Sequence, residues 1–182
     1  TWKEFELIEP NPKTSYRREI TWGVFNEKAN RFANLLLQRG IKKGDKVAIL
    51  MMNGLEWLPI YFGILKTGAL AVPLNFRYSS DEIEYCVNLA EVDILVFSNA
   101  FIGRVEEIAD RISKGRLLIY VGEGCPGFAD DYNSLSANCS SQSPMVALTD
   151  EDYAAIYFSS GTTGFPKAIL HKHKALLHSC MV

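Results

Sequence analysis

Apolar positions along the chain form two kinds of pattern, and the first is a helical repeat near the N-terminus. Between residues 22 and 39 the apolar side chains recur with the spacing of one helix face, at Phe25, Ala29, Phe32, Ala33, Leu36 and Leu37. Thr21 can cap this helix, and Gly40 can adopt the left-handed conformation after its last turn. The pattern predicts a helix over residues 22–39.

The second pattern is a series of short, continuously apolar runs, which predict buried strands. The runs are Val47–Met52, Ala69–Pro73, Ile94–Phe97, Leu117–Val121 and Tyr153–Phe158. Such runs are typical of parallel strands that are covered on both faces. Helical stretches lie between the first four runs, at Leu55–Lys66, Ser79–Ala90 and Phe101–Ser113. The alternation predicts an α/β fold with repeated βαβ units in a mostly parallel sheet.

Local signals refine these boundaries. Ser79 and Glu82 have the spacing of a capping box. Pro59 lacks an N–H, so regular hydrogen bonding in its helix should begin near it. Residues 122–149 are rich in Gly, Pro and Ser, which is typical of loops. We therefore expect an α/β layer over 1–121, a surface connection over 122–150, and a strand–loop–strand or helix segment over 151–182.

Composition excludes several classes of protein. The 182 residues suffice for one domain of the usual ~150 residues. With 48% hydrophobic residues and a net charge of −2, the chain is globular in composition and lacks the basic excess of a general nucleic-acid binder. Its longest apolar runs are six residues, against about 20 needed to cross a bilayer. Four cysteines without a Cys-x-x-Cys pair favour reduced thiols in a cytoplasmic protein.

The two ends of the chain indicate a longer parent sequence. The chain begins with Thr1, and its last residues show no helix stop signal. We therefore expect it to be a fragment.

The strand Tyr153–Phe158 runs into a loop that combines glycines, hydroxyls and a lysine. Glycines permit positive φ and a close approach to a ligand, and successive backbone N–H groups form an anion-binding concavity. Hydroxyls donate hydrogen bonds to phosphate oxygens, and a lysine adds a charge-assisted bond. The loop therefore predicts a polyphosphate site. Its residues are Ser159, Ser160, Gly161, Thr162, Thr163, Gly164 and Lys167.

The structural alternative is the Ser/Thr/Gly turn of a hairpin with an exposed lysine. Other phosphate and nucleophile motifs are absent from the sequence: the loop does not match Gly-x-x-x-x-Gly-Lys-[Ser/Thr], and neither Gly-x-Gly-x-x-Gly nor Gly-x-Ser-x-Gly occurs.

Residues 159–167, with the apolar strand before them, resemble the phosphate-loop signature of the adenylate-forming superfamily. The Ser-Ser-Gly-Thr-Thr-Gly form is most similar to AMP-forming acyl-CoA synthetases of the fatty-acid–CoA ligase type. Residues 44–50, 53–68, 72–75 and 82–96 resemble the N-terminal region of the same family, in the same order. One departure is Ala168, where the family usually has Gly. If that position needs positive φ, Ala costs of order 1 kcal/mol or more, and if it serves strand packing the change is mild.

The resemblance implies part of an N-terminal AMP-binding domain and a two-step reaction. ATP and a carboxylic acid give an acyl-adenylate and pyrophosphate, and coenzyme A then forms the thioester. It assigns the seven loop residues to the ATP phosphates, with Mg²⁺ as a further cofactor, and it assigns no catalytic residue to this stretch. The family's Tyr-Gly-x-Thr-Glu segment, acidic ribose motif and small C-terminal domain do not occur in these 182 residues. We therefore expect this stretch alone to be inactive.

Two other functions stay open. One is a sibling adenylating enzyme for aromatic or amino acids, and the other is a non-catalytic fragment that binds a nucleotide and regulates a partner.

Several further residues have two interpretations. His173 falls where the family often has a histidine near the acyl side, and otherwise belongs to a solvated basic junction. We expect no metal site, because His171 and His173 are two ligands where zinc takes three or four. The aromatic residues could line an acyl tunnel or belong to the core: Trp57, Tyr61, Phe62 and Phe76. A truncated sheet would leave an apolar edge and favour self-association.

Overall fold

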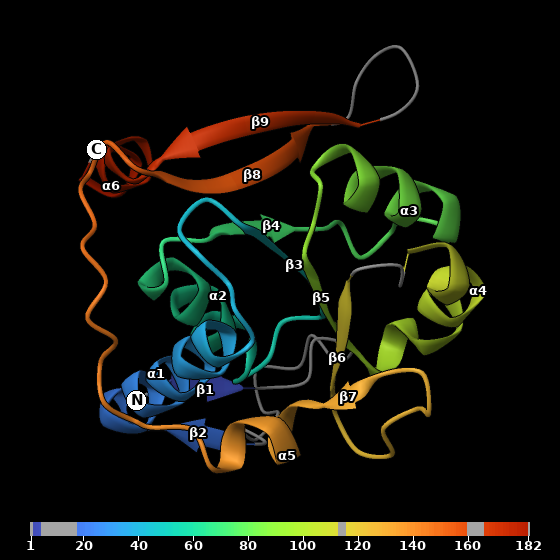
Figure 1. Ribbon diagram of the computed structural model, residues 1–182, viewed down its shortest axis with the longest axis horizontal. Coiled ribbons are helices and arrows are strands. Elements are labelled where there is room, and N and C mark those ends of the chain that lie inside the picture. The colour runs from blue at the N-terminus through green and yellow to red at the C-terminus, as the bar shows by residue number, and fades with distance from the viewer. Residues whose placement is uncertain (1, 5–17, 113–115, 160–165, 182) are drawn as a thin grey trace, which may run out of the picture.

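The computed structural model of the chain describes residues 2–4, 18–112, 116–159 and 166–181, and Figure 1 shows their arrangement. The elements are β1 (Trp2–Glu4), β2 (Arg18–Ile20), α1 (Trp22–Gln38), β3 (Lys46–Leu50), α2 (Trp57–Lys66), β4 (Leu70–Pro73), α3 (Ser80–Leu89), β5 (Ile94–Ser98), η1 (Asn99–Phe101), α4 (Ile102–Ile112), β6 (Leu117–Val121), β7 (Asp130–Asp131), α5 (Tyr132–Ala137), β8 (Tyr153–Ser159), β9 (Lys167–Lys172) and α6 (His173–Met181).

The described residues form a seven-stranded sheet with the strand order β7-β6-β5-β3-β4-β8-β9, and β1 and β2 pair separately. Neighbouring strands from β7 to β8 are parallel, whereas β9 returns antiparallel along β8. The α/β fold with a mostly parallel sheet is thus confirmed.

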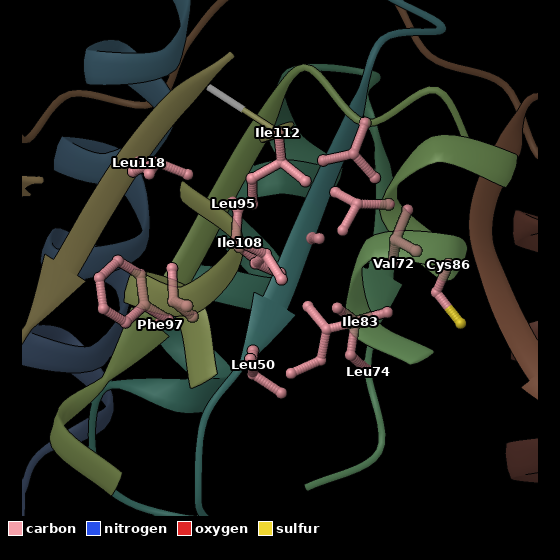
Figure 2. Packing of buried hydrophobic residues seen from close by; sticks show 14 of the residues in the cluster. Leu50, Val72, Leu74, Ile83, Cys86, Leu95, Phe97, Ile108, Ile112 and Leu118 are labelled. Atoms are coloured by element: carbon pink, nitrogen blue, oxygen red, sulfur yellow. The ribbon is translucent and has the colours of Figure 1, made fainter. Parts of the chain in front are cut away.

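Helices cover both faces of this sheet, which makes two hydrophobic cores. Val47 and Ile49 of β3 point into the core beneath α1 and α2, while Ala48 and Leu50 point into the core beneath α3 and α4. This alternation follows from the two-residue repeat of a strand. Figure 2 shows the second core, where Ile83 of α3 and Ile108 of α4 pack over the strands.

The capping signals are confirmed. The Thr21 hydroxyl accepts a hydrogen bond from Val24 N–H, and Ser79 and Glu82 form a complete capping box. Gly40 has φ +85°, and the Gly40 and Ile41 amides donate to the Leu37 and Leu36 carbonyls. These two bonds are the Schellman arrangement that ends a helix.

Helices α1 and α2 approach each other closely at Gly63. A Cβ atom there would lie 2.8 Å from the Ala29 carbonyl oxygen and 3.0 Å from Cδ1 of Phe32. A residue without a Cβ is therefore required at this crossing.

Residues 122–150 contain a strand and a helix that we did not expect. Asp131 caps α5 by accepting from Ser134 N–H at 2.8 Å. Tyr132 and Cys139 are buried in the core beneath α1 and α2. The turn-forming composition of this stretch gives no sign of α5, because the stability of this short helix comes from the burial rather than from helix propensity.

The chain from α5 to β8 is held by polar side chains of α1. Asn30 Nδ2 donates to the Ser141 carbonyl at 2.8 Å, and Asn34 Nδ2 donates to the carbonyls of Ser140 and Gln142 at 2.7 and 2.9 Å. Backbone groups in this irregular stretch thus find side-chain partners on a helix.

Candidate functional site

The predicted phosphate loop connects the two strands at one edge of the sheet. β8 is parallel to β4, so it ends at the carboxyl edge, which is where open α/β sheets bind ligands. The chain returns antiparallel along β9, with Ser159 opposite Lys167. The loop itself, residues 160–165, lies outside the described residues. Five of the seven candidate residues fall there: Ser160, Gly161, Thr162, Thr163 and Gly164.

Ser159 and Lys167 therefore mark the mouth of the loop. Lys167 is exposed, so its ammonium group is available to a ligand, whereas Pro166 beside it is buried. Seven residues, 160–166, separate the two positions. Hairpin loops usually contain two to five residues, so the connection is longer than strand reversal alone requires.

Side chains on the β8–β9 ribbon (residues 153–159 and 167–172) divide between the two faces of the sheet. Ile156 and Phe158 pack against the core beneath α3 and α4. Because successive side chains alternate, Tyr157 and Ser159 belong to the opposite face. Residues directly opposite each other share a face, so Lys167 and Ile169 of β9 lie on the same face as Ser159 and Tyr157.

On that face the ribbon contacts α2 through two phenols. The hydroxyl oxygens of Tyr61 and Tyr157 lie 2.8 Å apart. Burial, and secondarily the bond to Tyr157, raises the pKa of Tyr61 well above its usual value. His171 packs its ring edge against the Tyr157 ring at a centroid distance of 5.2 Å. No local sequence pattern predicts this contact, because Tyr61 and Tyr157 are 96 residues apart along the chain.

The four aromatic residues considered for an acyl tunnel do not share one environment. Tyr61 is buried and Trp57 stacks on it at 5.5 Å. Phe62 and Phe76 are 44% and 47% exposed, so the core interpretation is wrong for these two. Phe76 carries the Arg77 guanidinium over its ring at 5.3 Å.

The opposite end of the ribbon is fixed by the turn Thr149–Asp152. Asp152 accepts a hydrogen bond from Thr149 N–H and forms an ion pair with Lys43, each at 2.7 Å. The bond with Lys43, followed by that from Thr149, lowers the Asp152 pKa. The His173 amide donates to the Asp152 carbonyl at 3.0 Å. In this way the turn sets where α6 begins.

His173 is the first residue of α6, whereas His171 lies in β9, so they do not share a strand face. The His173 Nε2 atom is buried and has no hydrogen-bond partner among the described residues. Within the same part of the chain, no group of three or more His, Cys, Asp or Glu side chains is placed to hold a metal ion.

Ala168 lies in β9 opposite Phe158. Of the non-glycine residues described, Glu91 has positive φ and Ala168 does not. The conformational interpretation of the missing glycine is therefore wrong.

One further feature lies away from the ribbon. A pocket of about 340 Å³ lies at the amino ends of the strands, where its lining includes Asp45, Asp93 and Leu117.

None of the helices in the described ranges has the length and apolar character that crossing a bilayer would require.

Comparisons with known proteins agree on one family. A family model described as "AMP-binding enzyme" matches residues 9–182. A medium/long-chain-fatty-acid–CoA/3-oxocholest-4-en-26-oate–CoA ligase of Mycolicibacterium smegmatis is 32% identical over 162 residues, which are 86% of this chain and 29% of the relative. A crotonobetaine/carnitine–CoA ligase of Salmonella enteritidis is 35% identical over 162 residues, or 86% of this chain and 31% of the relative.

Solved structures give the same result. The anthranilate CoA ligase AuaEII in complex with anthranoyl-AMP superposes with a TM-score of 0.86 at 28% identity, covering 90% of this chain and 32% of that one. ATP-bound MatB from Rhodopseudomonas palustris superposes with a TM-score of 0.76 at 26% identity, covering 93% and 32%. The chain thus spans about three-tenths of the length of the curated relatives that it matches.

Proposed function

The chain belongs to the AMP-binding enzyme family, and from this premise we propose that the complete protein activates a carboxylic acid with ATP and transfers the acyl group to coenzyme A. In the first step a carboxylate oxygen attacks the α-phosphorus of ATP, the bond to the β-phosphate oxygen breaks, and pyrophosphate leaves. In the second step the coenzyme A sulfur attacks the acyl carbon, AMP leaves, and the thiol proton passes to solvent.

The observation that carries this proposal is the mouth of the loop. Ser159 and Lys167 face each other at the carboxyl edge of the sheet, with an exposed ammonium group on one side. Negative charge builds on the departing pyrophosphate, and a fixed cation with hydrogen-bond donors stabilises that charge. A general base is not needed, because a carboxylate is already ionised at neutral pH.

The remaining ATP ligands that we propose are Ser160, Gly161, Thr162, Thr163 and Gly164. Mg²⁺ would enter with the triphosphate. We assign no residue of this chain to it, since the described residues offer no group of three possible ligands.

We propose a fatty acid as the first substrate to test, because two fatty-acid–CoA ligases are among the relatives. An aromatic acid is the second candidate, because an anthranilate CoA ligase superposes with a TM-score of 0.86. His173 is the residue that we propose for the acyl side. Among the described residues its buried Nε2 atom has no hydrogen-bond partner, which supports this role, since burying such a group without a hydrogen bond is costly.

We propose that residues 1–182 alone do not make acyl-adenylate. These residues lack the segment that would place adenine. A non-catalytic nucleotide-binding regulator is the alternative for the chain by itself. Free thiols at all four cysteines support a cytoplasmic location.

ATP–pyrophosphate exchange by the complete protein, with a panel of fatty and aromatic acids, tests the proposal. Lys167→Ala should slow exchange about tenfold to a hundredfold, the factor expected for a hydrogen bond to a charged group. Lys66→Ala, which removes a lysine at the end of α2, is the matched control and should leave exchange unchanged. Unchanged exchange in Lys167→Ala would remove this lysine from the site. Absence of exchange with every acid would refute the activity.

A further inference from the structure

The β8–β9 ribbon is paired with itself over most of its length but only briefly with the rest of the sheet. Between β8 and β9 the register runs from Tyr153 opposite Lys172 to Ser159 opposite Lys167. Between β4 and β8 the described residues form one register pair, Ala71 opposite Ala155. Residues 156–159, which lead into the phosphate loop, therefore extend past the ladder with β4. Their position relative to the rest of the sheet therefore depends on side chains, and on one face Ile156 and Phe158 pack against the core beneath α3 and α4.

A side-chain contact bridges this part of the ribbon to a rigid helix. The Tyr157 hydroxyl lies 2.8 Å from the Tyr61 hydroxyl of α2. Helix α2 is firmly placed, since Ile60 and Ile64 are fully buried. Trp57 stacks on the Tyr61 ring at 5.5 Å, and the Phe62 ring meets it edge-on at 5.9 Å. The Tyr61 hydroxyl is thus a fixed point at the side of the ribbon.

The chemistry of the pair suits a permanent contact. A phenol is protonated at neutral pH, and burial raises the pKa of Tyr61 further. One hydroxyl can therefore donate to the other in either direction. From the opposite strand, the His171 ring packs against Tyr157 and limits the rotation of its ring.

We propose that Tyr61 and Tyr157 are positioning residues, whose hydroxyl contact fixes residues 156–159 against α2 and so sets where Ser159 and Lys167 stand. Tyr157 lies two residues before Ser159 on the same face of β8. Ser159 in turn pairs with Lys167. The contact thus acts on both ends of the loop without touching a ligand. The effect that we expect this contact to have on ATP binding rests on the proposed function.

Hydrogen–deuterium exchange of the complete protein tests the placement itself. Tyr61→Phe and Tyr157→Phe keep both rings and remove one hydroxyl each. Amides in a peptide covering residues 156–159 should exchange about threefold to tenfold faster in either variant, the factor expected for one net hydrogen bond. The double variant should match the single variants, because all three lack the same contact. Tyr153→Phe, which removes an exposed hydroxyl at the far end of β8, is the control and should leave this peptide unchanged.

Steady-state kinetics tests the consequence for the loop. Each single variant should raise the KM for ATP about threefold to tenfold, while the KM for the acid stays at the wild-type value. A general loss of folding would instead lower the active fraction and shift neither KM. Unchanged exchange at residues 156–159 would overturn the positioning role, and so would faster exchange with an unchanged KM for ATP.

The two proposals can fail separately. If the wild-type protein shows no ATP-dependent exchange with any acid, the proposed function is refuted, and hydrogen exchange alone still decides whether the Tyr61–Tyr157 contact holds the ribbon. If the wild-type protein catalyses ATP–pyrophosphate exchange and neither variant changes the KM for ATP, the proposed function stands and the positioning role is refuted.

Discussion

At the scale of a residue, one missing Cβ sets how closely α1 and α2 pack. Gly63 lies where a methyl group would come within 2.8 Å of the Ala29 carbonyl oxygen, and its φ is not in the left-handed region. Its requirement is therefore space rather than conformational freedom. Gly103 of α4 offers a contrast, since a Cβ there would meet nothing within 4 Å.

This contrast predicts opposite effects of the same substitution. Gly63→Ala should destabilise the fold by about 1–3 kcal/mol, because the helices must separate to admit the methyl group. Gly103→Ala should stabilise it by roughly 0.5–1 kcal/mol, because alanine restricts the unfolded chain and suits a helix interior. Urea unfolding followed by circular dichroism measures both. A neutral Gly63→Ala variant would show that the crossing adapts without cost.

Single residues also show what the sequence could and could not reveal. Thr21, Gly40 and the Ser79–Glu82 box were predictable, because a cap is a contact between residues at most a few positions apart. Ser159 and Lys167 belong to one contiguous motif, and their role at the ATP phosphates stays a prediction. The Tyr61–Tyr157 contact was not predictable, since it exists only once α2 and β8 are placed on the sheet.

At the scale of an element, the turn Thr149–Asp152 joins three parts of the chain. Lys43 reaches Asp152 from the loop before β3, while Lys174 and Lys172 bond to Glu151. The bond from Lys174, followed by that from Lys172, lowers the Glu151 pKa, and Lys43 does the same for Asp152. Both carboxylates therefore favour the folded state in their ionised form.

Stability should accordingly fall in acid. In the unfolded chain Asp and Glu titrate near about 3.9 and 4.3, above the lowered values in the fold. The stabilisation is complete above the unfolded values and is lost as the pH falls through the folded ones. The urea midpoint should decrease as the pH is lowered from about 6 to about 3. This range extends about one unit or more above and below the pKa values of Asp and Glu in the unfolded chain. Asp152→Asn should flatten part of this dependence, and an unchanged slope in that variant would contradict the assignment.

Elements that local sequence signals mark could be predicted, whereas elements that depend on tertiary contacts could not. The strands β3 to β6 were predictable from their continuous apolar runs, and the helices between them from the helical stretches that separate those runs. β7 and α5 were missed, because their stretch is polar and turn-forming except at the buried Tyr132 and Cys139. The Asp131–Ser134 spacing was the available signal, since it is that of an N-cap.

At the scale of the whole molecule, the sheet ends on an edge that is incompletely covered. Exposed apolar side chains lie on β9 and α6, at Ile169, Leu170, Leu177 and Met181. No residue of α6 is buried. Edge strands with apolar surface beside them favour association with another chain.

The 182-residue chain by itself should therefore self-associate as its concentration rises. Sedimentation velocity over a concentration series should show growing species, and Leu170→Lys with Leu177→Lys should shift them toward monomer. Met145→Lys is the matched control, since Met145 is fully exposed on the stretch between α5 and β8, away from this edge. Equal behaviour of the two variants would exclude the β9–α6 surface as the contact.

The reversal of direction at β9 has a consequence for how substrates could be read. Lys167 is the first residue of β9, and His173, the first residue of α6, directly follows its last. Six residue steps at about 3.4 Å each separate them by roughly 20 Å. The strand therefore keeps the two positions at a fixed separation. In the proposed function this distance separates the residue assigned to the acid, His173, from the residue assigned to the triphosphate, Lys167, so that a change at one position need not disturb the other.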